Sequence, residues 1–199
     1  QLHKAIHSFP TRRSSDLLAQ HFRKSAEDAL EGKESSLSAL RTYLGLPTGR
    51  ETGTFLALDF GGTNVRASRI RLMGEQGFAV ESKVAKPLKC ADYDYTASSK
   101  TADELFDFIA AIVKEAADGN HDYKLGFTFS FAVDQTSAKD ASLIAWSKEI
   151  AVLGVAGQSI NGLLKEALVR AGLDRIEPVA LLNDTTATLL SSVYQHNPS

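Results

Sequence analysis

The chain has 199 residues, with 22 basic and 24 acidic side chains and a formal net charge of -2 when histidine is neutral. This balance argues against a protein that binds nucleic acid or a charged membrane surface, because both need a clustered excess of Lys and Arg. Apolar residues make up 43% of the chain, as in globular proteins with a buried core. No uncharged apolar run approaches the roughly 20 residues of a membrane span. The single cysteine, Cys90, cannot form an internal disulfide. We therefore expect a cytoplasmic protein without nucleic-acid or membrane partners, and the sequence indicates no oligomeric state.

The first segment differs from everything that follows it. One back-translation of residues 7–17 (HSFPTRRSSDL) resembles a widely used sequencing adapter. We therefore expect residues 1–17 to be a sequencing artefact without function. A disordered Ser/Arg tail is the alternative, and a targeting peptide comes third because no apolar core region precedes the segment. His3 and His7 lie four residues apart in this segment and the other histidines are scattered, so the spacing predicts no histidine metal site.

An amphipathic helix is predicted next. From Leu18 to about Leu44, apolar residues recur at three- and four-residue steps among charged ones. The turn formers Gly45, Pro47 and Gly49 should end this helix.

Three antiparallel strands should follow the helix. They are predicted at Thr54–Phe60, Val65–Leu72 and Phe78–Val84. The first two are joined by Gly61-Gly62-Thr63-Asn64 and the last two by a turn over Met73–Gly77, which is typical of consecutive hairpins.

Helices and strands alternate in the rest of the chain. Thr101 should be the N-cap of a helix that runs to Ala117, with Glu104 completing a capping box. The elements predicted after it are a strand at Tyr123–Phe131, a helix at Ile160–Ala171 ended by Gly172, a strand at Glu177–Leu182 and a helix at Asp184–Tyr194. The order β-β-β-α-β-α-β-α predicts an α/β fold with a mixed sheet.

The turn after the first predicted strand has residue types that suit a phosphate group. Its glycines let backbone N–H groups approach an anion, its short polar side chains add hydrogen bonds, and its carboxylate could hold a hydrated magnesium ion. Taken alone, the segment is equally well explained as an ordinary hairpin turn. The candidate residues are Asp59, Gly61, Gly62, Thr63, Asn64 and Arg66.

Polar residues also follow two later strands. Ser130 comes after alternating phenylalanines that we expect in the core, and its hydroxyl could hydrogen-bond a ligand. Asp184 begins a helix after a buried-type strand, where it is either an N-cap or a carboxylate that accepts a proton from a substrate hydroxyl. Lys148, which follows Trp146-Ser147, reads in isolation as a solvated lysine.

Together, four segments resemble the hexokinase family of the actin-like ATPase superfamily, and they occur in the family's order. LALDFGGTNVR is similar to its first phosphate motif, LGFTFSFAVDQ to its sugar-binding strand, WSKEI to its sugar-binding loop and LLNDTTATLL to its catalytic-aspartate segment. The resemblance covers roughly residues 18–194, and WSKEI resembles bacterial-type members. The chain departs from the family at Ala132, where a proline is usual, and at Glu149-Ile150, where Gly-Phe is usual.

The resemblance implies an ATP-dependent kinase that phosphorylates a hexose, with glucose as the expected substrate, on its primary hydroxyl in the first step of glycolysis. Asp184 would be the general base, and Lys148 would stabilise charge on the transferred phosphoryl group. The residues implied to bind the hexose are Ser130, Ser147, Lys148, Asn183 and Asp184. Those implied to lie along the phosphates of ATP are Gly61, Gly62, Thr63, Asn64 and Arg66, with Asp59 orienting magnesium through water.

The resemblance also implies a domain arrangement. Residues 51–199 would form the small lobe of an actin-like ATPase (ribonuclease-H-like) fold, a mixed β-sheet flanked by helices, and residues 18–50 a helix that belongs to a second lobe. That lobe would be missing, so we expect an amino-terminal fragment with little activity by itself. The alternative is a noncatalytic relative that binds or senses a hexose, although intact Asp59, Lys148 and Asp184 weigh against it. A different actin-like ATPase would not need SFAVDQ and WSKEI together.

Overall fold

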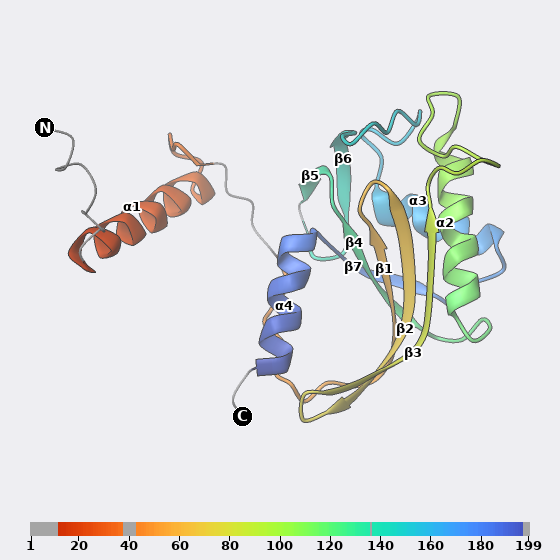
Figure 1. The fold of residues 1–199 in the computed structure, drawn as a ribbon, viewed down its shortest axis with the longest axis horizontal. Coiled ribbons are helices and arrows are strands. Elements are labelled where there is room, and N and C mark those ends of the chain that lie inside the picture. Colours follow the sequence, from red (N-terminus) through yellow and green to blue (C-terminus); the bar gives the residue numbers. More distant parts are fainter. Residues whose placement is uncertain (1–11, 38–42, 136, 197–199) are drawn as a thin grey trace, which may run out of the picture. The chain divides into compact units, whose positions relative to one another are not determined.

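The computed structural model describes residues 12–37, 43–135 and 137–196 (Figure 1). The chain divides into two compact units, residues 1–41 and residues 42–199. The boundary between them precedes the predicted boundary at residues 50 and 51. No helix in the described part of the chain is long and apolar enough to cross a membrane.

In the first unit, the described residues 12–37 contain one helix, α1 (Arg12–Leu30). The prediction of a helix over residues 18–44 is wrong at both ends, although residues 38–42 lie outside the described part. The helix ends early because Gly32 adopts a left-handed backbone, with φ of 72°. The amide groups of Gly32 and Lys33 then donate to carbonyls of the last helical turn at 3.1 and 2.9 Å. The apolar spacing in the sequence continues past this point, whereas the helical backbone conformation ends there.

The second unit is built on one mixed sheet with strand order β3-β2-β1-β4-β7. Its antiparallel part is the predicted meander, in which β2 pairs with both β1 and β3. Strands β4 and β7 add in parallel on the other side of β1. The predicted α/β fold with a mixed sheet is therefore confirmed. The strand bounds are β1 (Thr52–Phe60), β2 (Asn64–Gly74), β3 (Gly77–Pro87), β4 (Lys124–Phe129) and β7 (Glu177–Leu182).

Helices flank this sheet on both sides. Helices α2 (Ala102–Ala116) and α3 (Ile160–Arg170) contact each other and pack on the sheet, whereas α4 (Asp184–His196) lies on its other side (Figure 1). The predicted capping box of α2 is confirmed. The Thr101 hydroxyl accepts the Glu104 amide N–H at 3.3 Å, and the Glu104 carboxylate accepts the Thr101 amide N–H at 2.9 Å.

A second, two-stranded sheet was not predicted. Strands β5 (Ala132–Gln135) and β6 (Ala141–Ala145) pair antiparallel in a hairpin of their own. The strands have only four and five residues, and β5 also contains Asp and Gln, so intrinsic strand propensity gives only a weak signal for them. Leu143 of β6 is 1% exposed, so its burial in the core stabilises the hairpin. A local sequence pattern does not show this burial.

Aromatic residues fill the core beneath one end of the sheet. Phe127, Phe129 and Phe131 are buried, as predicted. The ring of Phe131 lies 5.1 Å from that of Phe60 and 5.0 Å from that of Trp146, between centroids. Edge-to-face packing of this kind holds the ends of β1 and β4 together with the segment that follows β6.

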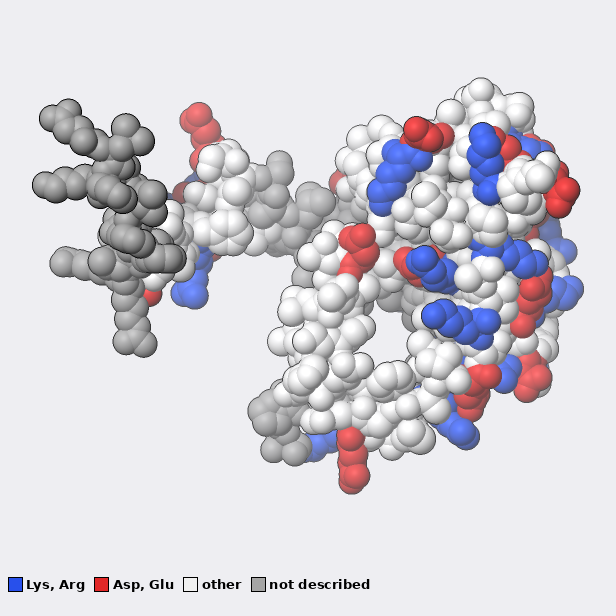
Figure 2. All heavy atoms as spheres, in the orientation of Figure 1, with Lys and Arg blue, Asp and Glu red and all other residues white. Residues whose placement is uncertain are grey.

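Charges of both signs are interspersed over the visible face of the second unit (Figure 2). The visible face carries no single-sign patch of the kind that attracts a polyanion.

Candidate active site

The carboxyl ends of three parallel strands meet at one edge of the sheet. Asp59 of β1 pairs with Thr128 of β4, and Thr128 pairs with Leu182 of β7, so the three residues form a row across the strands. The segments that follow this row begin at Phe60, Phe129 and Asn183. This edge is where open α/β folds place their ligands.

The β1–β2 turn is a closed hairpin turn, as the sequence indicated. The Gly61 amide N–H donates to the Asn64 carbonyl at 3.4 Å, and the Asn64 side chain donates to the Thr63 hydroxyl at 3.2 Å. Gly62 is buried with φ of 99°. A Cβ at Gly62 would lie 2.6 Å from Cδ of Lys148, so a larger residue would collide with the lysine stem.

Lys148 reaches this turn from the end of β6. Its Nζ donates to the carbonyl oxygens of Gly61 and Ser130, each at 3.1 Å. Lys148 is exposed, as its reading in isolation predicts, but its amine also bridges the segments after β1 and β4. Trp146, two residues before Lys148, is held in place because its indole N–H donates to the Val152 carbonyl at 2.9 Å.

Asp59 and Arg66 form an ion pair across the β1–β2 ladder. They are register partners, and Nη1 of Arg66 lies 2.9 Å from Oδ2 of Asp59. The other carboxylate oxygen accepts no hydrogen bond from the described residues. Magnesium in proteins uses one or two carboxylates together with waters and phosphate oxygens, and Asp59 fits one such carboxylate. No cluster of three His, Cys, Asp or Glu in the described ranges could hold a metal by itself.

Asn183 and Asp184 stand at the start of α4. The Asn183 side-chain oxygen accepts the Thr186 amide N–H at 2.8 Å, which makes Asn183 the N-cap. The interpretation of Asp184 as the N-cap is wrong, because Asp184 is the first residue of the helix. Its Oδ1 accepts the Thr185 amide N–H at 2.8 Å, and its Oδ2 has no partner among the described residues. One oxygen is thus oriented by the helix while the other can accept a proton.

The predicted site also includes two serine hydroxyl groups, those of Ser130 and Ser147. Ser130 donates its amide N–H to the Phe60 carbonyl at 3.2 Å, which fixes its backbone at the end of β4. The Ser147 carbonyl accepts the Ile150 amide N–H at 3.4 Å. Neither hydroxyl hydrogen-bonds to a described residue, so both are available to a polar ligand.

A hollow of about 440 Å³ opens between the β1–β2 turn and the loop after β3. It brings together four predicted residues, whereas Ser130, Ser147, Asn183 and Asp184 do not line it. Its other wall was not predicted from the sequence, because the residues there form no motif. The lining residues are Gly62, Thr63, Asn64, Pro87, Leu88, Lys89, Thr96, Lys148 and Glu149.

The missed loop is tied to the turn and carries one perturbed carboxylate. The Leu88 amide N–H donates to the Thr63 carbonyl at 2.9 Å. Asp94 pairs with Lys89 at 2.7 Å and accepts the Thr96 amide N–H at 2.9 Å. The bond from Lys89, followed by those from Thr96, lowers the pKa of the Asp94 carboxyl to about 2.

A second hollow, of about 490 Å³, is lined mostly by apolar side chains. It lies between α4 and strands β2 and β3 in the second unit, and Figure 2 shows it as an opening between α4 and the body of the sheet. Its walls include Leu72, Phe78, Leu190 and Tyr194. None of the predicted site residues lines it.

Fold and site together define an α/β lobe in which a mixed sheet flanked by helices presents a glycine turn, a lysine and a carboxylate at one edge. The chain belongs to the hexokinase family, because the family model described as "Hexokinase" matches residues 2–194. The family resemblance is thereby confirmed, and superposition on solved hexokinases confirms the expected actin-like small-lobe fold.

Individual relatives agree with this assignment. Hexokinase-1 of Schizosaccharomyces pombe is 39% identical over 157 residues, which cover 76% of this chain and 31% of that protein. Hexokinase-1 of Arabidopsis thaliana is 41% identical over 174 residues, which cover 82% of this chain and 34% of that protein. The chain thus spans about a third of the length of these relatives. Both are eukaryotic, so the bacterial-type assignment is not confirmed.

Solved structures show the same fold. A structure titled "Crystal structure of Hexokinase" superposes with a TM-score of 0.81 at 34% identity, over 93% of this chain and 44% of that chain. The hexokinase of Schistosoma mansoni complexed with glucose superposes with a TM-score of 0.72 at 30% identity, over 92% of this chain and 40% of that chain.

Proposed function

We propose that this chain contributes the sugar- and phosphate-binding residues of an ATP-dependent hexokinase, with glucose as the expected hexose. The observation that carries the proposal is Lys148, whose amine bridges the turn after β1 and the segment after β4. Support also comes from the relatives, which are named hexokinases, and from the solved relative that is titled as a glucose complex. A cytoplasmic location and the first step of glycolysis belong to the same proposal.

The sugar would be bound by short polar groups at the edge of the sheet. The hydroxyls of Ser130 and Ser147 have no partner among the described residues, and the amide nitrogen of Asn183 stays free while its oxygen caps α4. Such groups suit a polyol, because a wrong isomer would leave them unpaired. Lys148 and Asp184 would complete this half of the sugar site.

Proton transfer would fall to Asp184. A general base must present a free oxygen to the hydroxyl that it deprotonates, and Oδ2 of Asp184 is such an oxygen. The helix amide that holds Oδ1 keeps the carboxylate oriented. As the sugar's primary hydroxyl attacks the γ-phosphate, its proton would pass to Asp184.

The phosphates would lie along the β1–β2 turn. Backbone groups of Gly61 and Gly62, the side chains of Thr63 and Asn64, and the Arg66 guanidinium would face them. Magnesium, when bound with ATP, supplies positive charge that offsets the charge of the phosphate oxygens. Asp59 would orient the ion through water with the oxygen that Arg66 leaves free. Lys148 would exchange its carbonyl partners for the transferred phosphoryl group.

The test is glucose-dependent formation of ADP. It is measured for the chain itself and for a chimera in which residues 42–194 replace the matching segment of the S. pombe relative. We expect turnover in the chimera and a loss of roughly 10²-fold or more in kcat with Asp184→Asn, because general-base catalysis contributes typically 10²–10⁴-fold. Asp92→Asn, at an exposed carboxylate, is the matched control.

Two outcomes would contradict the proposal. Near-normal turnover of the Asp184→Asn chimera would remove the general-base role. Glucose-dependent fluorescence of Trp146, the only tryptophan of this chain, measured on the chain itself, together with no ADP formation by the chimera, would favour the noncatalytic hexose-binding relative instead.

A further inference from the structure

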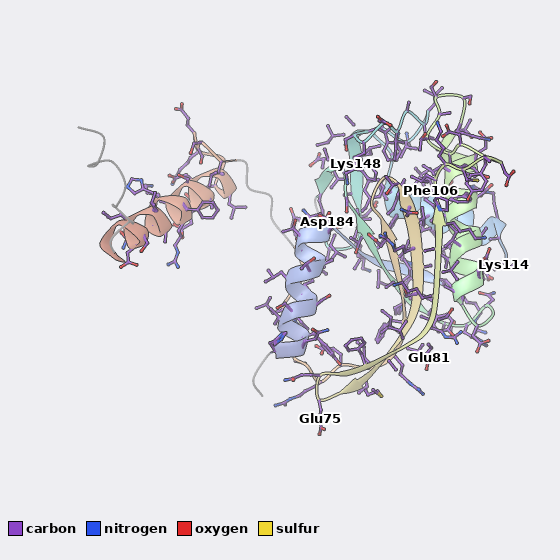
Figure 3. The ribbon with its side chains drawn as sticks, in the orientation of Figure 1. Glu75, Glu81, Phe106, Lys114, Lys148 and Asp184 are labelled. Atoms are coloured by element: carbon purple, nitrogen blue, oxygen red, sulfur yellow. The ribbon has the colours of Figure 1, made fainter. Side chains whose placement is uncertain are left out.

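The β5–β6 hairpin carries Lys148 but does not belong to the main sheet. Trp146, Ser147 and Lys148 follow directly after the last residue of β6. Strands β5 and β6 pair only with each other as a sheet. The position of the Lys148 amine at the active-site edge therefore depends on how this hairpin is attached to the rest of the unit (Figure 3).

The loop of the hairpin is attached to β7, which is an edge strand of the main sheet. The Leu181 amide N–H donates to the Ala138 carbonyl at 3.0 Å. The Leu181 carbonyl accepts from Nε2 of Gln135 at 2.8 Å, and the same nitrogen donates to the Ser137 carbonyl at 2.8 Å. An edge strand leaves backbone groups unpaired, and Leu181 is 1% exposed, so these bonds satisfy groups that water cannot reach.

The attachment point lies next to the candidate general base. Leu181 stands two residues before Asn183 and three before Asp184 in the same strand-to-helix segment. Gln135 therefore joins the hairpin that ends at Lys148 to the strand that delivers Asp184. Both of its amide protons are used, because one bonds β7 and the other holds the hairpin loop closed.

A second attachment of the loop lies on its other side. Asp140 accepts the Asn161 amide N–H at 2.9 Å and the Ser159 hydroxyl at the start of α3. This contact holds the loop against the helix layer, whereas Gln135 holds it against the sheet. Among the residues that the structure describes, the side-chain link between the hairpin and β7 is the one from Gln135.

We propose that Gln135 is a positioning residue, which sets the place of Lys148 relative to Asp184 by hydrogen-bonding the Leu181 carbonyl. Gln135 touches neither candidate residue and acts through the hairpin and through β7. The catalytic roles of Lys148 and Asp184 rest on the proposed function, whereas the hydrogen-bonded link from Gln135 to β7 does not.

The experiment measures the reactivity of Lys148 in the chain itself. Purified chain is labelled with a lysine-directed succinimidyl ester, and the labelling rate of each lysine is followed by mass spectrometry. In Gln135→Met the side chain keeps its length but loses both donors. We expect labelling of Lys148 to rise about fivefold, the change that the loss of an ordinary hydrogen bond produces. Lysines on the far strands, such as Lys83, should keep their rates.

Gln158→Met is the matched control, because Gln158 is exposed and makes no side-chain hydrogen bond to a described residue. Gln135→Lys is the rescue variant, because its amine can donate to the same two carbonyls. A purely structural loss would raise the labelling of all lysines together. The proposal is overturned if folded Gln135→Met leaves Lys148 labelling unchanged, or if Gln135→Lys behaves like Gln135→Met.

Where Gln135→Met does not fold, the wild-type chain provides the test. At low urea concentrations, exchange of the Leu181 amide proton and labelling of Lys148 should rise together below the unfolding midpoint. Labelling that rises while the Leu181 amide stays protected would overturn the proposal. A separate measurement tests whether glucose protects Lys148 from labelling. If glucose gives no protection in the wild-type chain, the result counts against the proposed function but leaves the role of Gln135 intact.

Discussion

Lys148 and Glu149 have left-handed backbones, with φ of 60° and 64°. A residue with a Cβ pays roughly 1–2 kcal/mol for this conformation, which glycine adopts freely. Glu149 stands where related sequences are expected to have glycine, so the chain keeps strain next to its candidate catalytic lysine. Strain at such a position is typical of functional loops.

Replacing Glu149 by glycine should therefore stabilise the chain. We expect Glu149→Gly to raise the free energy of unfolding by about 1 kcal/mol in a urea titration, since relief of left-handed strain outweighs the added freedom of the unfolded glycine. Glu149→Ala removes the carboxylate but keeps the Cβ, so it should give no such gain. Equal stabilisation by both variants would assign the effect to charge instead of backbone strain.

Asn183 combines two roles in one side chain. Its oxygen caps α4 by accepting the Thr186 amide N–H, and its nitrogen is free to donate to a sugar hydroxyl. Asn183→Asp keeps the capping oxygen, and the helix N-terminus tolerates the added charge. We expect its unfolding free energy to stay close to that of the wild type, while the glucose response of Trp146 fluorescence is lost.

Asn183→Ala provides the comparison, because it loses the cap as well. It should destabilise the chain by about 1 kcal/mol, the usual value for a lost N-cap. A full glucose response in Asn183→Asp would show that the amide nitrogen takes no part in binding.

The loop between β3 and α2 is an element whose geometry depends on one carboxylate. Asp94 binds Lys89 and Thr96, and the loop in turn is bonded to the β1–β2 turn through Leu88 and Thr63. The folded-state pKa of Asp94 lies at about 2, below its ordinary value of 3.8. The contribution of Asp94 to stability is therefore complete above pH 3.8 and is lost as the pH falls through about 2.

We expect stability to fall between pH 3.8 and about 2 more steeply in the wild type than in Asp94→Asn. Urea midpoints at a series of pH values measure the difference between the two. Asp92→Asn, two residues away and exposed, should keep the wild-type slope. Parallel curves for the wild type and Asp94→Asn would show that the Lys89 and Thr96 contacts do not persist in solution.

Some elements could be predicted from sequence because their signals are local. The α2 capping box needs only Thr101 and Glu104 three residues apart, and both the hairpin turns and the strand ends carry glycine or polar residues. The end of α1 was predicted wrongly because Gly32 interrupts a pattern whose apolar spacing continues. The β5–β6 hairpin was not predicted, because its strands are short. Its stability comes from burial of Leu143 and from contacts with β7, which lies far away in the sequence.

At the scale of the whole molecule, the site depends on contacts between distant parts of the chain. The bond from Lys148 to Gly61 joins residues 87 positions apart, and that from Gln135 to Leu181 joins residues 46 apart. The residue types of the site could be predicted from motifs, whereas these contacts could not, because no local pattern encodes which strand ends meet. The parallel addition of β4 and β7 to β1 supplies that information.

The same long-range contacts make the second unit self-contained. Among the described residues, the buried apolar side chains all lie between Leu56 and Tyr194, within residues 42–199. A domain that holds its own core should fold and unfold cooperatively by itself. We therefore expect residues 42–199, expressed alone, to unfold in a single sigmoidal urea transition followed by Trp146 fluorescence.

Association is the main competing effect in this measurement. The apolar hollow between α4 and strands β2 and β3 is lined by Phe78, which is exposed, and by Leu190, which is half-buried. Exposed apolar surface promotes self-association. The titration is therefore repeated at two protein concentrations, and coincident curves exclude a contribution from association. A broad, non-cooperative transition with strong binding of an apolar dye would contradict the prediction, because it would mean that residues 42–199 collapse without fixed packing when residues 1–41 are removed.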